Sequence, residues 1–496
     1  MIYRLLVEID GGPERFEAAD HPSTVMSKRT ERILLFSLDF LTINLAYLVY
    51  YWLRVRSGLF KYPIEPELYL PMLAIYFYWL VLFSFFGLYR SWYAQSRLDE
   101  IITLFRTTAA GVLVLFFTIF IDDSASHPQP ETRLLIGAYW LLLFGFVSVG
   151  RLSIRATQKR LLEAGIGARN TLIVGWSAKG RELCDMVLKY PALGYKLVGF
   201  VDAGGTRGGK RSKRAEYKHL PLVGSSDQLS ALIKEHDVRE VLVGLDSSEH
   251  DKLIHIITEC TGFDVRLKMM ADLYDIVSGQ ARVSSIYGAP LIEVNPEIMK
   301  PWEESLKRVL DVLVSLLILI IGFPFWLFVA ALIKLDSPGP VLYGQERLGK
   351  NSKPFRIFKF RSMSADAEKK SGPVWAAKHD PRVTRFGRII RRLHIDEVPQ
   401  FLNVLTGDMS LVGPRPERSF FVEKLSAELP LYKRRLKVRP GITGWAQVKH
   451  KYDESIEDVK AKLKYDLFYI ENMSWRMDLK ILFNTFYVML TGKGHT

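Results

Sequence analysis

The stretch Leu310–Ile333, LDVLVSLLILIIGFPFWLFVAALI, decides how this chain folds and where it lies. It is apolar except for Asp311 and Ser315, and it is long enough to cross a bilayer as one helix. Pro324 lies near its middle, beside Gly322, and a proline there removes a backbone hydrogen bond and kinks a helix. We therefore expect a broken helix that enters one leaflet and returns. A complete span with a proline kink is the alternative.

Four segments further upstream are also long and apolar enough to span a bilayer. They are Ile33–Leu53, Leu68–Leu88, Ile101–Ile121 and Leu134–Val149. Asp39 and Arg106 lie within such segments, where an ionisable side chain faces a neighbouring helix or a cavity. One hypothesis is a pair inside the bundle, and the other is an ordinary packing contact.

Basic residues predict how these segments are oriented. The loop Asp122–Thr132 has no lysine or arginine, whereas four basic residues follow the fourth segment between 151 and 160. Residues after about 150, and with four crossings the N-terminus, are therefore expected in the cytoplasm. Arg54, Arg56 and Lys61 in the first loop argue weakly against this orientation. A further crossing at 310–333 would place the basic C-terminal part outside, which supports the returning helix.

The overall composition narrows the class of protein. The 496 residues carry a formal charge of +14, which suits nucleic acid, a phosphate ligand or an anionic membrane surface. The apolar segments favour the membrane and count against nucleic acid. Two cysteines, Cys184 and Cys260, argue against a disulfide scaffold and fit a reducing compartment. Residues 1–25 have no long apolar core, so no cleavable signal peptide is expected.

Strand and helix patterns alternate over residues 168–295 and predict a doubly wound parallel sheet. The glycine loop Gly175–Gly180 follows the first expected strand, but Ser177 takes the place of the second glycine of a dinucleotide-binding loop. Asp202 ends the second strand where a ribose would lie. A structural or regulatory domain without a cofactor is the preferred interpretation, and nucleotide binding is the alternative. The basic run between Gly204 and Lys218 is expected to be a solvated loop.

An acidic pair, Asp396 and Glu397, interrupts the most basic part of the chain. From Lys350 to Gln400 there are 13 lysines and arginines against five acidic residues, a net of +8. Two adjacent carboxylates repel each other, and a bound Mg²⁺ would remove that conflict. Carboxylates within a cationic field are typical of phosphoryl chemistry on an anionic substrate. The alternative is an exposed acidic pair on a basic helix.

The residues before this pair predict a basic amphipathic helix. Phe386, Ile389, Ile390 and Leu393 form one apolar stripe, and arginines cover much of the remaining surface. Such a helix commonly lies on an anionic membrane. If the helix ran on, Asp396 would stack over Arg392.

Three further segments supply candidate anion donors. Lys359 and Arg361 follow a strand-like alternation, Arg415 lies between two prolines, and Arg439 begins a segment with Pro440 and Gly441. Prolines and glycines fix the shape of a loop, which helps to hold an arginine against a phosphate. Each segment alone is more typical of a turn, but three of them beside an acid pair favour a binding function.

These motifs resemble those of the bacterial sugar transferases known as monotopic phosphoglycosyl transferases. The similarity covers about residues 305–496 in order and spacing. It rests on Lys359-Phe360-Arg361-Ser362-Met363, Asp396-Glu397-Val398-Pro399-Gln400, Asn403-Val404-Leu405, Gly407-Asp408-Met409-Ser410-Leu411-Val412-Gly413-Pro414-Arg415-Pro416 and Arg439-Pro440-Gly441-Ile442-Thr443-Gly444. The upstream part is similar, more loosely, to the large polyprenyl-phosphate hexose-1-phosphate transferases.

The resemblance implies transfer of hexose 1-phosphate, glucose or galactose, from a UDP-sugar to undecaprenyl phosphate with release of UMP. It implies that Asp396 attacks the sugar-bearing phosphate to form a covalent intermediate, and that the second catalytic residue, Glu397, helps to hold Mg²⁺ or assists the attack. Both Asp396 and Glu397 are expected metal ligands. It implies anion binding by Lys359, Arg361, Arg415 and Arg439. A UDP-N-acetylamino sugar is the alternative substrate, and a non-catalytic nucleotide-sensing membrane scaffold is the alternative outside enzymes.

The resemblance also implies an architecture. The expected fold is an α-helical membrane protein with a cytoplasmic tail, a four-helix transmembrane domain, a Rossmann-like α/β domain and a mostly α catalytic domain with a re-entrant helix at 310–333. Their expected limits are 1–30, 31–155, 165–298 and 303–496. The protein is expected to be a homodimer in the bacterial inner membrane with its catalytic domain on the cytoplasmic face. The family usually has Ser-Pro at the kink, whereas this chain has Phe323-Pro324.

Overall fold

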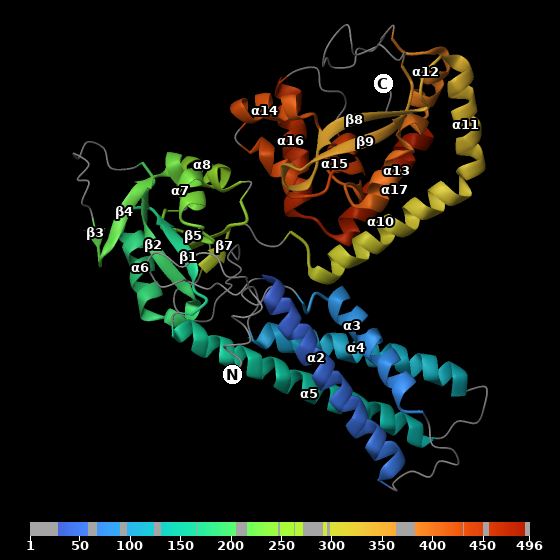
Figure 1. Cartoon of the computed structure of the whole chain (residues 1–496). Coiled ribbons are helices and arrows are strands. Elements are labelled where there is room, and N and C mark those ends of the chain that lie inside the picture. The colour runs from blue at the N-terminus through green and yellow to red at the C-terminus, as the bar shows by residue number, and fades with distance from the viewer. Residues whose placement is uncertain are drawn as a thin grey trace, which may run out of the picture. The chain divides into compact units, whose positions relative to one another are not determined.

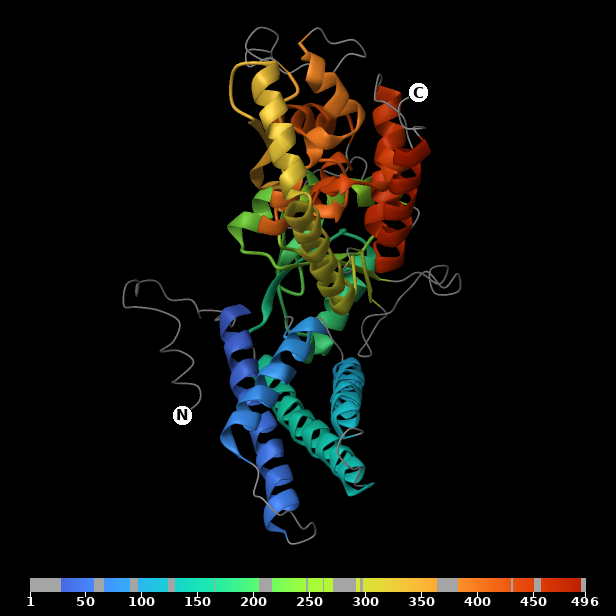
Figure 2. The same cartoon turned by 90° about the vertical axis from the view of Figure 1, so that its right-hand side faces the viewer.

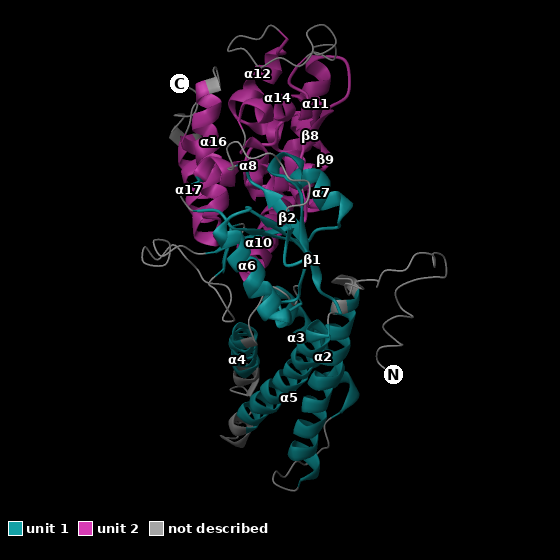
Figure 3. Ribbon diagram, turned by 90° about the vertical axis from the view of Figure 1, so that its left-hand side faces the viewer, with its two compact units in different colours: residues 1–249, 265–295 teal, residues 250–264, 296–496 magenta. Residues whose placement is uncertain are grey.

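A computed structural model describes most of the chain. The described residues are 28–57, 67–89, 97–123, 130–164, 166–204, 216–246, 249–261, 263–270, 291–294, 298–363, 382–429, 431–449 and 456–491. Most of the expected tail 1–30, the region considered for a signal peptide and residues 205–215 of the basic loop lie outside them. The chain divides into two compact units, residues 1–249 with 265–295 and residues 250–264 with 296–496 (Figure 1, Figure 3). The expected domain limits remain predictions.

The first unit begins with four apolar helices, drawn in blue to blue-green in Figure 2. They are α2 Lys28–Tyr51, which continues as the π-helix η1 Trp52–Arg56, α3 Tyr69–Phe85, α4 Arg97–Asp123 and α5 Pro130–Glu163. Stretches of α2 with η1, of α4 and of α5 are long and apolar enough to cross a membrane, and α3 is a shorter apolar helix of 17 residues. The sequence therefore predicted the positions of all four helices, three of them with the full length of a span.

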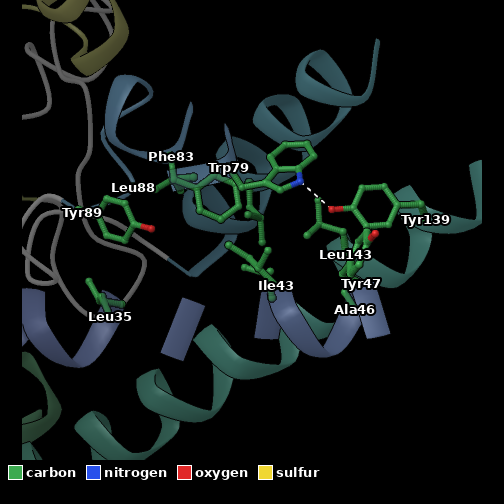
Figure 4. Packing of buried hydrophobic residues seen from close by; sticks show 12 residues of the cluster. Leu35, Ile43, Ala46, Tyr47, Trp79, Phe83, Leu88, Tyr89, Tyr139 and Leu143 are labelled. Atoms are coloured by element: carbon green, nitrogen blue, oxygen red, sulfur yellow. Dashed lines mark hydrogen bonds between the residues drawn. The ribbon is translucent and has the colours of Figure 1, made fainter. Parts of the chain in front are cut away.

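Aromatic side chains fill the core of these four helices (Figure 4). Trp79 and Phe83 of α3 are fully buried against Ile43 of α2 and Leu143 of α5. The indole N–H of Trp79 donates a 2.8 Å hydrogen bond to the Tyr139 hydroxyl, so this polar group is satisfied within an apolar environment. The four helices thus share one core.

A buried ion cluster joins side chains of α2, α4 and α5 to the residues that follow α3. Arg151 of α5 donates to the carboxylate of Asp39 at 2.6 Å, to Glu100 at 3.2 Å and to the carbonyl of Leu88 at 2.9 Å. Asp39 lies in the middle of α2, Leu88 follows α3 and Glu100 lies near the start of α4, so the cluster connects all four helices. The hypothesis that Asp39 pairs with Arg106 is wrong, because Arg106 is exposed. Arg151 lies just beyond the fourth apolar segment, where it was considered only for the orientation of the helices. Its pairing with Asp39 and Glu100 was therefore not predicted.

Replacing Arg151 with methionine would leave Asp39 and Glu100 buried without this partner. Breaking one side of a buried ion pair costs about 3–5 kcal/mol. We expect a clear loss of thermal stability of the purified protein in detergent. Lys159→Met is the control, because Lys159 and Glu163 form an exposed pair at 3.5 Å, which is worth about 0–1 kcal/mol. Equal melting temperatures for the two variants would contradict a stabilising role of the cluster.

The rest of the first unit contains a mixed seven-stranded sheet in the order β3-β4-β2-β1-β5-β6-β7. Strands β4, β2, β1, β5 and β6 run parallel, and β3 and β7 are antiparallel edges. The strands are β1 Arg169–Val174, β2 Tyr195–Asp202, β3 Glu216–Tyr217, β4 Leu220–Ser225, β5 Glu240–Val243, β6 Arg266–Met270 and β7 Leu291–Glu293. The helices between these strands are α6 Ala178–Lys189, η3 Pro191–Leu193, η4 Ser226–Gln228, α7 Leu229–Glu235 and α8 His250–Cys260. Of these, α8 belongs to the second unit. The expected parallel sheet is present, with antiparallel edges added.

The glycine loop of this sheet is closely packed. A Cβ at Gly180 would lie 2.0 Å from the carbonyl oxygen of Gly175, so α6 can approach β1 only with a glycine there. The Ser177 hydroxyl accepts from the N–H of Gly180 at 3.1 Å and donates to the carbonyl of Gly244 at 2.7 Å. Packing and helix capping therefore account for this loop. Nucleotide binding with Asp202 remains an untested alternative.

The larger part of the second unit, residues 296–496, begins with two helices joined at a bend, α10 Pro301–Ile321 and α11 Phe323–Asp336 (Figure 1). Their axes differ in direction by 64°. The break predicted at Pro324 is therefore present. Two short sheets follow, an antiparallel hairpin of β8 Leu342–Leu348 and β9 Pro354–Phe360 and a parallel pair of β10 Ser410–Val412 and β11 Gly441–Thr443. The remaining helices are η5 Lys350–Ser352, α12 Arg385–Arg392, η6 Ile395–Glu397, α13 Gln400–Thr406, α14 Ser419–Glu428, η7 Tyr432–Lys437, α15 Trp445–Lys449, α16 Ile456–Glu471 and α17 Trp475–Thr491.

The first half of α10 is bound to the rest of the unit through polar contacts. The buried Asp311 accepts a 3.0 Å hydrogen bond from the N–H of Leu411. Lys307 bonds Asp478 at 2.5 Å, and Arg308 donates to the carbonyls of Val404 and Leu405 at the end of α13. The polar residues of this apolar segment thus anchor it. The part near the bend instead exposes large apolar side chains, Leu317, Ile320, Ile321 and Phe323, each 59–72% exposed.

Candidate active site

The acid pair lies on a single 3-10 turn, η6, between α12 and α13. Helix α12 ends at Arg392, and His394 adopts a left-handed backbone with φ 55° that turns the chain before Asp396. The expected stacking of Asp396 over Arg392 in a continuous helix is therefore wrong. Asp396 is only 7% exposed, which also excludes an exposed acidic patch for this residue.

The two carboxylates of the pair have different partners. Glu397 Oε1 accepts from Lys359 Nζ at 2.8 Å and from an Arg415 guanidinium nitrogen at 3.0 Å. Asp396 forms no hydrogen bond or ion pair with the described residues, although it is nearly buried. Glu397 is thus held between two cations, whereas the Asp396 carboxylate has no such contact with the described residues.

The same difference shows in the pKa values. Burial raises the pKa of Asp396 above its usual value, and the adjacent Glu397 adds to the rise, while Lys359 opposes it. Burial acts in the same direction on Glu397, but the charges of Arg415 and Lys359 outweigh it and hold its pKa well below the usual range. Glu397 is therefore ionised at any physiological pH, and Asp396 is the group whose protonation changes more easily.

Lys359 reaches the site from strand β9. The antiparallel hairpin pairs Lys359 with Tyr343 of β8. The side chain of Asn403 on α13 accepts from the N–H of Phe358 at 3.0 Å and donates to the carbonyl of Arg356 at 2.8 Å. Asn403 therefore fixes the strand that carries Lys359 against the helix that follows the acid pair.

Arg415 is positioned by a charge network behind its loop. Arg435 donates to the carbonyl of Arg415 at 3.2 Å and bonds Asp466 at 2.7 Å, and both Arg435 and Asp466 are buried. Arg347 donates to the carbonyl of Pro416 at 3.2 Å. These positioning residues were absent from the sequence prediction. Their contacts join segments 20–69 positions apart, so no local motif reveals them.

Arg361 lies beside the end of α11, and its predicted role in anion binding stays a prediction. Its guanidinium lies in a buried position at the C-terminal end of α11, where one nitrogen donates to the carbonyls of Ile333 at 3.2 Å and Ser337 at 2.5 Å. Cations stabilise this end of a helix because its carbonyls lack helical partners. In this structure Arg361 caps α11, and its hydrogen bonds do not include the acid pair.

Arg439 lies in the loop that precedes β11. Its backbone packs tightly on the Arg415 loop, since a Cβ at Gly413 would lie 2.5 Å from the carbonyl oxygen of Arg439. Its half-buried guanidinium forms no hydrogen bond or ion pair with the described part of the chain. The structure thus brings Asp396, Glu397, Lys359 and Arg415 into one cluster, and places Arg439 on the adjoining loop.

The acid pair suits a divalent cation that also binds substrate. The described residues contain no group of three or more His, Cys, Asp or Glu side chains arranged for a metal. Mg²⁺ is often held by one or two carboxylates together with substrate phosphates. Asp396 and the second carboxylate oxygen of Glu397 provide hard oxygen ligands of this kind, so the site fits Mg²⁺ only in a complex shared with a phosphate ligand.

Comparison with known proteins identifies the two parts of the chain. The family model described as bacterial sugar transferase matches residues 302–492, and one described as a CoA-binding domain matches residues 84–271. The first match includes every residue of the candidate site.

Similar curated proteins include three transferases. The UDP-glucose:undecaprenyl-phosphate glucose-1-phosphate transferase of Escherichia coli (strain K12) is 30% identical over 428 residues, 84% of this chain and 88% of that protein. The enzyme with the same name from Xanthomonas campestris pv. campestris is 28% identical over 86% of this chain and 89% of its own length. The UDP-N-acetylgalactosamine-undecaprenyl-phosphate N-acetylgalactosaminephosphotransferase of Aeromonas hydrophila is 41% identical over 238 residues, 48% of this chain and 55% of that protein. The chain therefore belongs to the bacterial sugar transferase family of phosphoglycosyl transferases.

Proposed function

We propose that this protein transfers hexose 1-phosphate, glucose or galactose, from a UDP-sugar to undecaprenyl phosphate. The observation that carries the mechanism is the difference between the two carboxylates: Glu397 is fixed by two cations, whereas the nearly buried Asp396 forms no hydrogen bond or ion pair with the described residues. The Escherichia coli and Xanthomonas relatives, each similar over more than 80% of this chain and of its own length, are named glucose-1-phosphate transferases, which supports a hexose substrate. Family membership favours this enzyme over a non-catalytic scaffold.

In the proposed first step an oxygen of the ionised Asp396 carboxylate attacks the phosphorus that carries the sugar. The bond from that phosphorus to the bridging oxygen breaks, and UMP leaves with that oxygen and the electron pair. The product is a mixed anhydride between Asp396 and the sugar phosphate. A covalent intermediate lets a soluble and a membrane-bound substrate meet one nucleophile in turn.

In the second step an oxygen of undecaprenyl phosphate attacks the same phosphorus. The bond between Asp396 and phosphorus breaks, the carboxylate is regenerated and undecaprenyl-diphosphate-sugar is released. Neither step consumes a proton, so the protein must stabilise negative charge instead. Arg415 and Lys359 are positioned for that role beside Glu397, and Arg439 is a further candidate on the adjoining loop.

Mg²⁺ held by Asp396, Glu397 and phosphate oxygens of the substrate would neutralise negative charge on those oxygens. The two carboxylates then serve as metal ligands in addition to the roles described above. Removal of Mg²⁺ with a chelator is therefore expected to stop UMP release.

The proposed setting is the bacterial inner membrane. The exposed apolar side chains around the bend between α10 and α11 support a re-entrant helix that enters one leaflet, and α2 to α5 would form a four-helix transmembrane bundle. The catalytic part would then lie on the cytoplasmic face, where UDP-sugars are found. A homodimer is also proposed, from the resemblance to the large family members.

The second candidate substrate is a UDP-N-acetylamino sugar. The Aeromonas relative, whose name includes N-acetylgalactosamine, is more similar over its matched part than the glucose transferases. A panel of UDP-glucose, UDP-galactose and their N-acetylamino counterparts separates the candidates, with UMP release measured on membrane-embedded enzyme with undecaprenyl phosphate and Mg²⁺. Turnover confined to the N-acetylamino sugars would exclude the hexose assignment. No UMP from any of them would contradict the proposed reaction.

The position of Lys359 also predicts how the pH profile of UMP release changes when this lysine is replaced. Lys359 lowers the pKa of Asp396, so Lys359→Met should raise it further. The reactive form is the ionised carboxylate, and its population falls as the pH falls through the pKa. The acid limb of the pH profile for UMP release without lipid should therefore move to higher pH. Lys353→Met, an exposed lysine of the same hairpin region, is the control and should leave the acid limb unchanged.

A further inference from the structure

A tryptophan closes the bend between α10 and α11. The indole N–H of Trp326 donates a 3.0 Å hydrogen bond to the carbonyl of Ile318, eight residues earlier on the other helix. Eight residues of a straight helix extend about 12 Å, which is more than an indole can span. The bond therefore forms only when the chain bends, as it does here by 64°.

The sequence around the bend is adapted to this bond. Pro324 has no N–H, so the helical pairing is interrupted at this position. Gly322 has an ordinary helical φ of −77°, so its backbone alone would accept alanine. A Cβ there, however, would lie 2.3 Å from the indole nitrogen of Trp326 and 2.6 Å from the Ile318 oxygen. Gly322 thus leaves the space that the tryptophan occupies.

Other parts of the second unit bind α10 and the end of α11 through hydrogen bonds. The bend between them lies outside these contacts and is fixed by the Trp326 hydrogen bond. Asp311 anchors α10, and Arg361 anchors the end of α11. Trp326 is partly buried against a cluster that contains Phe360, the neighbour of Lys359 in sequence, and Ile390 of α12. We call the residues around the bend, between these two anchors, the tip. Apart from Trp326, the tip has exposed apolar side chains, including Phe323 at 63%.

We infer that Trp326 is a positioning residue for the second half of the reaction, acting through the Ile318 carbonyl to fix the tip against strand β9. This inference rests on the proposed function. A fixed tip sets the depth at which the membrane-bound phosphate approaches Asp396. The soluble UDP-sugar does not depend on that depth. The family usually has serine before the proline at the kink, whereas this chain has Phe323. Here the hydrogen bond across the break is donated by Trp326 of α11.

Trp326→Phe removes the N–H and keeps an aromatic ring, and Gly322→Ala crowds both the indole and the Ile318 carbonyl, so it breaks the bond while keeping the tryptophan. We expect each to raise the KM for undecaprenyl phosphate about tenfold and to leave UMP release from UDP-sugar without lipid within about twofold. The double variant should be no worse than either single one, because both remove the same bond. Phe323→Leu, which removes no polar group, is the matched control and should behave like the unsubstituted protein.

A distance measurement tests the inference without activity. Spin labels at Ile321→Cys on the tip and Arg388→Cys on α12 can be attached selectively, because both native cysteines are buried. We expect the distance distribution to broaden in Trp326→Phe and Gly322→Ala but not in Phe323→Leu. An unchanged distribution, or equal slowing of both half-reactions, would overturn the inference. If the unsubstituted protein released no UMP, the proposed function would fail, while the distances would still show whether Trp326 holds the tip.

Discussion

Asp396→Asn is expected to reduce UMP release by about 10³-fold or more. An amide is a poor nucleophile, so no anhydride with the sugar phosphate can form. The substitution is nearly isosteric, and Asp396 forms no hydrogen bond with the described residues that the amide would break. The loss should therefore appear in catalysis rather than in stability. It is measured as UMP release with UDP-sugar, both with and without undecaprenyl phosphate.

Two controls make this result interpretable. Glu423→Gln neutralises an exposed carboxylate on α14 of the same unit and should leave activity unchanged. The melting temperature of Asp396→Asn should stay at or above that of the unsubstituted protein, because the buried carboxylate carries a raised pKa and is costly to keep ionised. Turnover close to normal in Asp396→Asn would mean that another group is the nucleophile.

Arg415→Ala is expected to have the second-largest effect, a loss of about 10²–10³-fold in UMP release. Removing one preorganised cation from a site where negative charge develops typically has this magnitude. The substitution also removes one of the two cations on Glu397, whose other partner is Lys359 at 2.8 Å. Release of UMP under saturating UDP-sugar measures the effect directly.

The matched control for Arg415→Ala is Arg434→Ala. Arg434 forms a 2.6 Å pair with Glu471, which is 44% exposed, so its loss should change activity little. Arg415→Lys tests geometry, because lysine keeps the charge but not the planar fork of donors. We expect it to recover only part of the activity. If Arg415→Ala and Arg434→Ala had equal effects, the Arg415 loop would have no special role.

The sequence predicted the elements whose signals are local. Long apolar runs located α2 to α5, Pro324 located the bend, and the adjacent carboxylates with proline-flanked arginines pointed to the candidate site. Arg415 and Lys359 could be named because they lie in compact motifs. The sequence could not show that both would bind the same oxygen of Glu397, since they approach it from positions 18 and 38 residues away.

The errors of prediction share one physical origin. One of the two hypotheses for Asp39 paired it with the wrong arginine, and the hydrogen bonds of Arg361 to the end of α11 were not foreseen, while substrate binding by Arg361 stays a prediction. A charged side chain reveals its residue type in the sequence but not its partner, because the partner depends on how distant elements pack. The same limit hid Arg435, Asp466 and Trp326, whose roles arise from contacts across the fold. Apolar periodicity and backbone breaks are therefore predicted better than buried polar networks.

The measurement that tests the central claim most directly is the intact mass of the protein after incubation with UDP-sugar and Mg²⁺ but without undecaprenyl phosphate. The mechanism predicts an added sugar phosphate on a single residue, mapped to Asp396, which disappears when undecaprenyl phosphate is supplied. It also predicts no adduct in Asp396→Asn. An adduct on a different residue, or full turnover with no covalent adduct at any time, would contradict Asp396 as the nucleophile.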